Sequence, residues 1–173
     1  QGRVSDWDHD STLIAHDAAG TLLTLLNADY WVRKRGAENI ASLDSLVAAD
    51  PAQRNNLWVA VLYAQFNQPI QAKNVVAAYD TAVAQRHRSG FLDHDVARQA
   101  TMGWILLAQN RPLDAVKEFR GSRVVADGSV NNSLIERDLE IGLAFERAGL
   151  PDSAIISYEH FLNTPYSDRF NDD

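Results

Sequence analysis

The sequence predicts an all-α fold, and three observations carry that prediction. One is an internal repeat of helix-periodic stretches. Another is the placement of Pro51, Pro69, Pro112 and Pro151, each of which precedes a helix-periodic segment. Proline at the first helical position is favourable because its missing N–H would have had no partner there. The last is the lack of any sustained alternation of apolar and polar residues that would indicate strands.

The repeat consists of a bulky residue, a Pro, an Ala soon after the Pro and, in two copies, an aromatic ring one turn beyond the Ala. Two full copies and one looser copy are Leu106–Pro112–Ala115–Phe119, Phe145–Pro151–Ala154–Tyr158 and Tyr63–Pro69–Ala72–Val76. Self-similarity of this kind is typical of arrays in which one supersecondary unit stacks on the next.

The helical segments follow one another along the chain with short turns between them, which favours antiparallel pairs. Gly20 and Gly36 interrupt the N-terminal third, while Gly90 and Gly149 are expected just past helix ends. A capping box at Ser133–Glu136 predicts a helix start. The expected helices are 11–27, 37–49, 52–66, 70–87, 94–109, 113–124, 134–148 and 152–163, with 28–35 as a candidate extension of the first.

Composition narrows the function classes. The chain has 173 residues, 46% of them hydrophobic, and a net charge of −7, so a packed core is expected and a nucleic-acid partner is not. The basic clusters 33–35 and 86–88 are interpreted as helix ends. The chain has no cysteine, which excludes disulfides and thiolate chemistry but leaves cytoplasmic, periplasmic and extracellular locations open. No signal peptide is visible, and no apolar run reaches the ~20 residues of a membrane helix.

Two of the copies also share a small residue in the first helix of each pair. The matching positions are Gly103, Leu106, Ala115 and Phe119 in one copy and Gly142, Phe145, Ala154 and Tyr158 in the other, with Ala60, Tyr63, Ala72 and Val76 in the third. On these residues the chain resembles the tetratricopeptide repeat (TPR) family, in a divergent bacterial form. In that arrangement the small residue lets the two helices approach, and the aromatic ring fills the gap against the neighbouring hairpin.

The resemblance implies a single domain over 1–173, a short right-handed solenoid of antiparallel hairpins. A degenerate hairpin at 11–49 precedes repeats at about 52–87, 94–124 and 134–163. The family period is about 34 residues, and the longer spacing here places extra residues between hairpins, at 86–95 and 124–132. The last copy also resembles repeat tails of large bacterial signalling proteins. The alternative is an unrelated array of helical hairpins.

In the family, the first helices of successive hairpins line a concave surface that binds peptides or partner helices. The candidate groove carried over by position is Arg54, Leu57, Val61, Gln65, Ala97, Ala100, Trp104, Leu107, Glu136, Leu139, Leu143 and Glu146. The basic clamp that grips a C-terminal carboxylate in some members is missing. An apolar strip around Trp104 suits an amphipathic helix better. The alternatives are that Trp104 is core or that the chain's own N-terminal segment fills the groove. Trp7, Trp31 and Trp58 are expected to be packing residues.

No catalytic or metal-binding motif is present. Asp8-His9-Asp10 and Asp93-His94-Asp95 are interpreted as helix N-caps. Asp6, Asp8, Asp10 and Asp17 imitate four positions of a calcium loop, but Ser11 stands where that loop needs Gly. The charged residues Arg137, Asp138, Glu140, Glu146 and Arg147 are expected on a solvated helix face. The chain is therefore not expected to be an enzyme or to hold a cofactor or metal.

The sequence thus predicts a non-catalytic scaffold that binds a peptide or partner helix within a larger complex. A structural or self-assembling accessory subunit of a larger, membrane-associated or soluble assembly is one alternative, because a solenoid exposes apolar faces at its ends unless polar caps cover them. A sensor or regulatory repeat domain of a bacterial signalling protein is another. The sequence does not identify the partner.

Overall fold

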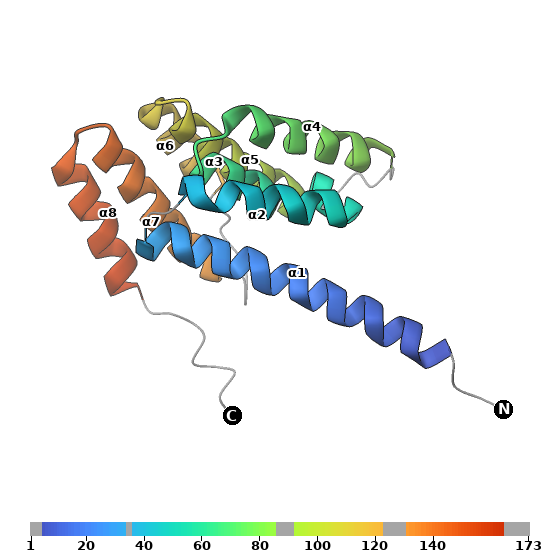
Figure 1. Cartoon of the computed structure of the whole chain (residues 1–173). Helices are drawn as coiled ribbons and strands as arrows, with labels where there is room; N and C mark the ends of the chain where they lie inside the picture. The colour runs from blue at the N-terminus through green and yellow to red at the C-terminus, as the bar shows by residue number, and fades with distance from the viewer. Residues whose placement is uncertain (1–4, 34–35, 86–91, 123–130, 165–173) are drawn as a thin grey trace. The chain divides into compact units, whose positions relative to one another are not determined.

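The computed structural model describes the backbone of residues 5–33, 36–85, 92–122 and 131–164 and the side chains of residues 18–32, 38–85, 96–122 and 137–164. Within these ranges all regular secondary structure is helical, as predicted, and there is no strand (Figure 1). The helices are α1 (Ser5–Arg33), α2 (Gly36–Ala49), the 3-10 helix η1 (Pro51–Asn55), α3 (Leu57–Gln65), α4 (Pro69–Gln85), α5 (Leu92–Ala108), α6 (Pro112–Gly121), α7 (Asn131–Arg147) and α8 (Pro151–Asn163).

Most predicted helix limits agree with the structure to within a few residues, and two regions differ. Helix α1 begins at Ser5 and continues through Gly20 to Arg33, so Gly20 does not interrupt it. The expected helix 52–66 is instead a 3-10 turn followed by α3. The break lies at Asn56, whose backbone is extended and whose side chain accepts a hydrogen bond from the Trp58 N–H (2.9 Å). The capping box at Ser133 lies inside α7, which starts at Asn131.

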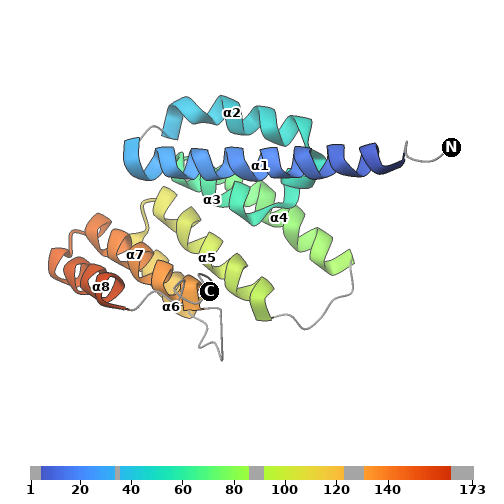
Figure 2. The same ribbon diagram turned by 90° about the horizontal axis from the view of Figure 1, so that it is seen from below.

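The chain divides into two compact units, residues 1–79 and residues 80–173. In the first unit α1, α2 and α3 pack on one another, and Figure 2 shows α2 lying along α1. Helix α1 contributes one apolar stripe at helical spacing, Ala19, Leu23, Leu26 and Tyr30, all of which are buried. Polar contacts join the same helices. Asn39 Nδ2 donates to Asp29 Oδ2 (2.8 Å) and the Tyr63 hydroxyl donates to Asp44 Oδ1 (2.6 Å).

In the second unit each helix packs against the next one along the chain, α5 on α6, α6 on α7 and α7 on α8. Figures 1 and 2 both show α7 and α8 running antiparallel, joined by a short turn. The core of this unit includes Ile105 and Phe119, which are fully buried. Helix α6 is thus covered by a helix on each side, whereas α8 packs on α7.

The turn that precedes a proline has the same geometry in all three copies of the repeat. Asn67, Asn110 and Gly149 adopt positive φ angles of 61°, 57° and 72°. In each turn the next N–H reaches back to the carbonyl of the bulky repeat residue, from Gln68 to Tyr63 (2.7 Å), from Arg111 to Leu106 (2.9 Å) and from Leu150 to Phe145 (3.0 Å). This pattern is a Schellman motif, which satisfies carbonyls at the end of a helix.

After each turn the repeat alanine is turned inward. Ala72, Ala115 and Ala154 are buried, and the N–H of each bonds to the carbonyl of the residue just before the proline. A larger side chain at these positions would hold the helices apart. The repeat seen in the sequence therefore corresponds to a recurring local structure: helix end, left-handed residue, proline start and buried alanine.

The repeat glycines face the repeat aromatics, with one correction to the sequence interpretation. A Cβ on Gly103 of α5 would lie 2.5 Å from Phe119 Cε1 of α6, and a Cβ on Gly142 of α7 would overlap the ring of Tyr158 of α8. The ring therefore fills the gap over the glycine of its own hairpin and not only a gap against the neighbouring hairpin. Because α5 and α6 form one hairpin, the absence of a side chain at Gly103 is what lets them approach.

Candidate functional site

Trp104, placed at the centre of the candidate groove by the sequence, joins three helices of the second unit. Its ring is 3% exposed and meets Phe119 of α6 edge-on, with centroids 5.9 Å apart and planes at 76°. Its Nε1–H donates to Glu140 Oε1 of α7 (2.8 Å). A buried indole with its N–H bonded to a carboxylate is a packing residue with a satisfied polar end.

Glu140 and Asp138 are buried, in contrast to the solvated helix face expected for this part of α7. Glu140 also lies beside Arg137, with Oε2 and Nη1 separated by 2.6 Å, and both side chains are largely covered. Glu146 and Arg147 are exposed, as expected. The buried acids owe their position to partners on other helices, since Glu140 receives the Trp104 N–H from α5 and Asp138 receives a bond from α8.

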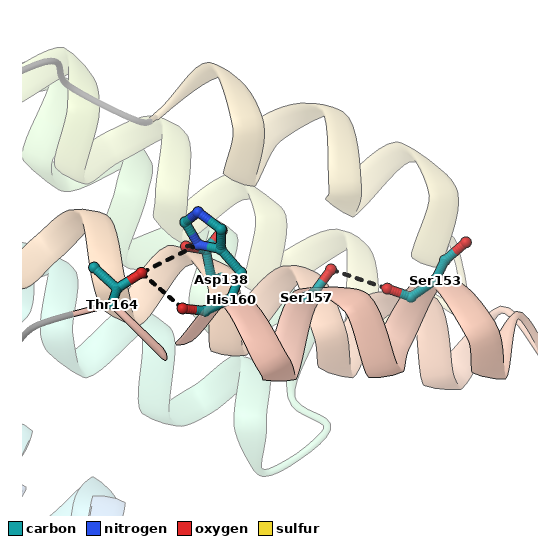
Figure 3. A network of polar contacts seen from close by, with 5 residues as sticks. All are labelled: Asp138, Ser153, Ser157, His160 and Thr164. Atoms are coloured by element: carbon teal, nitrogen blue, oxygen red, sulfur yellow. Dashed lines mark hydrogen bonds and ion pairs between the residues drawn. The ribbon is translucent and has the colours of Figure 1, made fainter. Parts of the chain in front are cut away.

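The partner of Asp138 is His160 on α8 (Figure 3), with 2.7 Å between Asp138 Oδ2 and His160 Nδ1. A carboxylate can only accept, so Nδ1 carries the proton in this contact. The imidazole is itself more than half exposed. Thr164 closes the end of α8, because its hydroxyl donates to the His160 carbonyl (2.7 Å). In the same view the Ser157 hydroxyl donates to the Ser153 carbonyl (3.0 Å).

An acid, a histidine and a hydroxyl in one place invite comparison with a nucleophilic triad. In a triad the acid and the nucleophile contact opposite nitrogens of the ring. Here Thr164 Oγ1 lies 3.4 Å from His160 Nδ1, the same nitrogen that faces Asp138. The threonine hydroxyl is also bonded to a backbone carbonyl. This geometry does not activate Thr164. The contact between His160 and Asp138 instead holds the C-terminal end of α8 against α7.

In the second unit, the candidate groove residues fall into two sets. Ala100, Trp104 and Leu107 of α5 are buried, so their side chains are not presented to a partner, while Ala97 is exposed. Leu139 and Leu143 of α7 are half-buried and Glu146 is exposed. The Glu146 carboxylate accepts the Tyr158 hydroxyl hydrogen bond (2.8 Å). Among the described side chains of this unit, α7 thus offers Leu139, Leu143 and Glu146 to solvent, and α5 offers Ala97. The side chain of Glu136 lies outside the described residues.

In the first unit, Arg54 of η1 is exposed, Leu57 and Val61 of α3 are half-buried and Gln65 is buried. Trp58 is 39% exposed, against the expectation that it is a packing residue. Trp31 is partly covered and contacts Tyr30 edge-on, as expected for packing. The side chain of Trp7 lies outside the described residues. Trp58 lies in the first turn of α3, just after the helix break at Asn56 that was not predicted.

The N-cap interpretation of the two acidic tripeptides is wrong, and the acidic residues that imitate a calcium loop lie in a helix. Asp6, Asp8, Asp10 and Asp17 all lie inside α1, where a helical chain cannot fold around an ion as a calcium loop does. Asp93 and Asp95 lie in the first turn of α5 rather than ahead of it. Among the residues whose side chains are described, no three His, Asp or Glu side chains gather in a metal-binding cluster.

The outer side of α8 carries the most exposed apolar residues of the second unit. Ile155, Ile156 and Leu162 are 53%, 66% and 76% exposed. Beside them an open hollow of about 430 Å³ is lined by Ile156, Glu159, His160, Asn163 and Thr164. Isolated apolar residues at a surface are ordinary. Three on one short helix, next to a hollow, form a candidate contact surface.

Comparison with known proteins gives no match to a family model, a curated protein or a solved structure. Across the described part of the chain, none of the helices combines the length and the apolar character needed to cross a membrane.

Proposed function

We propose that the chain is a non-catalytic, TPR-like protein-interaction module that binds a peptide or helix of a partner protein within a larger complex. The observation that carries this proposal is the recurrence of one turn. Asn67, Asn110 and Gly149 occupy equivalent left-handed positions, each followed by a proline-started helix with a buried alanine. A chain that repeats a unit in this way builds extended surfaces from equivalent positions.

The polar groups of the second unit support a binding role over catalysis. Glu140 and Asp138 are engaged by Trp104 and His160 in contacts that hold helices together. Thr164 is not placed as a nucleophile. These groups stabilise the contacts between helices.

Within the proposed module, α7 is the helix of the second unit that presents the peptide-binding positions. Leu139 and Leu143 lie one turn apart and are partly open to solvent. An apolar pair with this spacing contacts the apolar face of an amphipathic helix or alternate side chains of an extended peptide. Trp104 supports α7 through its bond to Glu140, and because Ala100, Trp104 and Leu107 are buried, they do not touch the partner.

The test is a peptide-display selection on the purified full chain, followed by calorimetric titration of the enriched peptide. We expect Leu143→Ser to weaken binding by about tenfold or more, the loss of one buried apolar contact. Leu113→Ser, an exposed leucine on α6, is the matched control and is expected to bind as the wild type does. Circular dichroism must show that both variants stay helical. Failure to enrich any common motif, or equal binding by Leu143→Ser, would contradict the proposal.

A further inference from the structure

Helix α6 provides an internal reference for α8, because the two occupy equivalent places in successive copies of the repeat. Both start at a proline, bury an alanine and place a ring over a glycine of the preceding helix. Position for position, Val116 corresponds to Ile155 and Arg120 to Glu159. Differences in exposure between these pairs therefore reveal what a neighbouring helix covers.

Val116 is 4% exposed whereas Ile155 is 53% exposed. Helix α7 packs on α6, and its Phe145 lies under the Arg120 guanidinium, 5.4 Å from the ring centroid. We therefore attribute the burial of Val116, which lies one turn before Arg120, to α7. The side of α6 that carries Val116 and Arg120 is thus a helix-binding side. In α8 the corresponding side carries Ile155 and Glu159, and Leu162 follows at helical spacing. We call Ile155, Glu159 and Leu162 the α8 stripe.

We propose that the α8 stripe binds an amphipathic helix of a partner protein that carries a Lys or Arg opposite Glu159. The inference rests on the proposed interaction function and adds a second surface and the chemistry of its partner. Ile155 and Leu162, the apolar ends of the stripe, are seven residues or two helical turns apart, so they lie on the same face of α8. Apolar residues at this spacing form the face with which one helix packs on another. The partner covers Ile155 as α7 covers Val116.

The acidic residues of α8 indicate which kind of partner binds the α8 stripe. Helix α8 contains Asp152 and Glu159 but no Lys or Arg. Glu159 lies between the two apolar residues of the stripe, so a second copy packed by a two-fold axis would bring one Glu159 against the other. Like charges brought together at an interface disfavour that pairing. A basic residue on the partner helix forms an ion pair with Glu159. The net charge of −7 on the chain also attracts a basic partner.

The hollow beside the stripe gives the partner a second point of contact. Glu159 belongs to both the stripe and the lining of the hollow, together with Ile156 and the exposed imidazole of His160. A side chain from the docked helix can enter this open space beside Glu159. The carboxylate is then approached from the apolar stripe on one side and from the hollow on the other.

The experiment uses two synthetic helical peptides of about 15 residues, near the length at which isolated helices become stable. Both carry leucines at helical spacing; one has lysines flanking the leucines and the other has glutamates there. Fluorescence anisotropy measures their binding to the full chain. We expect the lysine peptide to bind and the glutamate peptide to bind at least about tenfold more weakly.

Two pairs of variants locate the binding. Ile155→Ser should weaken binding of the lysine peptide by about tenfold, while Leu113→Ser, which removes an apolar side chain of nearly equal exposure (52%), should not. Glu159→Lys should reverse the preference in favour of the glutamate peptide. Glu38→Lys on α2 changes the net charge equally at an exposed site and should leave the preference as it is.

Equal binding by Ile155→Ser and the wild type, or the same loss with Glu38→Lys as with Glu159→Lys, would overturn the α8 proposal. So would a wild-type dimer in sedimentation that Ile155→Ser converts to a monomer, because a second copy would then be the occupant. These outcomes are distinct from failure of the proposed function. A displayed peptide that depends on Leu143 but not on Ile155 leaves the function standing and removes only this surface.

Discussion

Gly103 of α5 lies directly under the ring of Phe119 of α6, so closely that a Cβ at Gly103 would come within 2.5 Å of the ring. The ring is fully buried, so moving it aside would disturb the packing around it. The contact between these two helices therefore depends on a missing side chain. The same relationship recurs between Gly142 and Tyr158, although that ring is only half-buried.

Gly103→Ala is accordingly expected to destabilise the chain, although alanine is the better helix former by about 1 kcal/mol. Overpacking a tight core costs about 1–3 kcal/mol, and the better helix propensity of alanine offsets about 1 kcal/mol of that cost, so we expect a net loss of up to about 2 kcal/mol in the free energy of unfolding. Urea titration followed by circular dichroism measures it. Gly142→Ala should cost less, because Tyr158 has room to move outward.

Gly20→Ala is the matched control for that series. Gly20 lies inside α1, and a Cβ there would meet nothing within 4 Å. This variant should gain about 0.5–1 kcal/mol, the helix-propensity term without the steric one. If Gly103→Ala also stabilises the chain, the Phe119 ring is not packed as described.

The left-handed residue of the second turn gives a prediction that depends on backbone conformation alone. Asn110 has a φ of 57°, which costs an alanine about 1 kcal/mol but a glycine almost nothing. Asn110→Ala should therefore be about 1 kcal/mol less stable than Asn110→Gly. Thermal melts of the two variants under one condition make the comparison.

The same pair of substitutions at Asn74 serves as its control. Asn74 is exposed in the interior of α4, where alanine is favoured over glycine by about 1 kcal/mol. The order of stability should therefore be reversed at Asn74. If the alanine variant is more stable than the glycine variant at both sites, Asn110 does not hold the left-handed conformation.

The bond between Trp104 and Glu140 predicts a coupling between α5 and α7. Trp104→Phe removes the indole N–H that a buried carboxylate accepts, and hydrogen bonds to charged groups contribute about 1.5–3 kcal/mol. Unfolding free energies of Trp104→Phe, Glu140→Gln and the double variant give the coupling energy. We expect a coupling of about 1 kcal/mol or more. Additive losses would show that the two side chains do not interact in solution.

Tyr63 predicts a stability change at alkaline pH. Burial, together with the hydrogen bond to Asp44 and the charge of its carboxylate, raises the pKa of the Tyr63 hydroxyl well above its usual range. In the unfolded chain a tyrosine loses its proton near pH 10. The contribution of the protonated hydroxyl is therefore fully present below about pH 10 and is lost as the pH rises beyond it.

Tyr63→Phe tests this directly. The variant lacks the Asp44 bond and should be less stable at neutral pH by about 1 kcal/mol. Its stability should then fall less steeply than that of the wild type from about pH 9 to about pH 11. Melting temperatures across that range provide the comparison. Parallel curves would contradict a raised pKa at Tyr63.

Much of the fold could be predicted because its signals are local. Pro69, Pro112 and Pro151 start helices where expected, and Gly149 adopts the left-handed conformation just past α7. Such signals act through a residue and its immediate neighbours, so they can be read from a few letters of sequence. The break at Asn56 was missed although it is local, because an Asn flanked by apolar residues also fits a helix interior.

The candidate site was predicted less well. The resemblance to the TPR family implied that Trp104, Leu139 and Leu143 belong to first helices of the repeat, but it could not show that Trp104 is buried while the two leucines are partly open. Nor could it show that Arg120 faces Phe145 or that the equivalent Glu159 is exposed.

The helical character of this chain, most of its helix limits and its recurring small residues are encoded locally in the sequence. The burial of Glu140 and Asp138 follows instead from tertiary packing, since their partners Trp104 and His160 lie 36 and 22 residues away along the chain. Burial depends on which helix faces are brought together in three dimensions. Helix formation depends mainly on the backbone hydrogen bonds and side chains of residues within one turn.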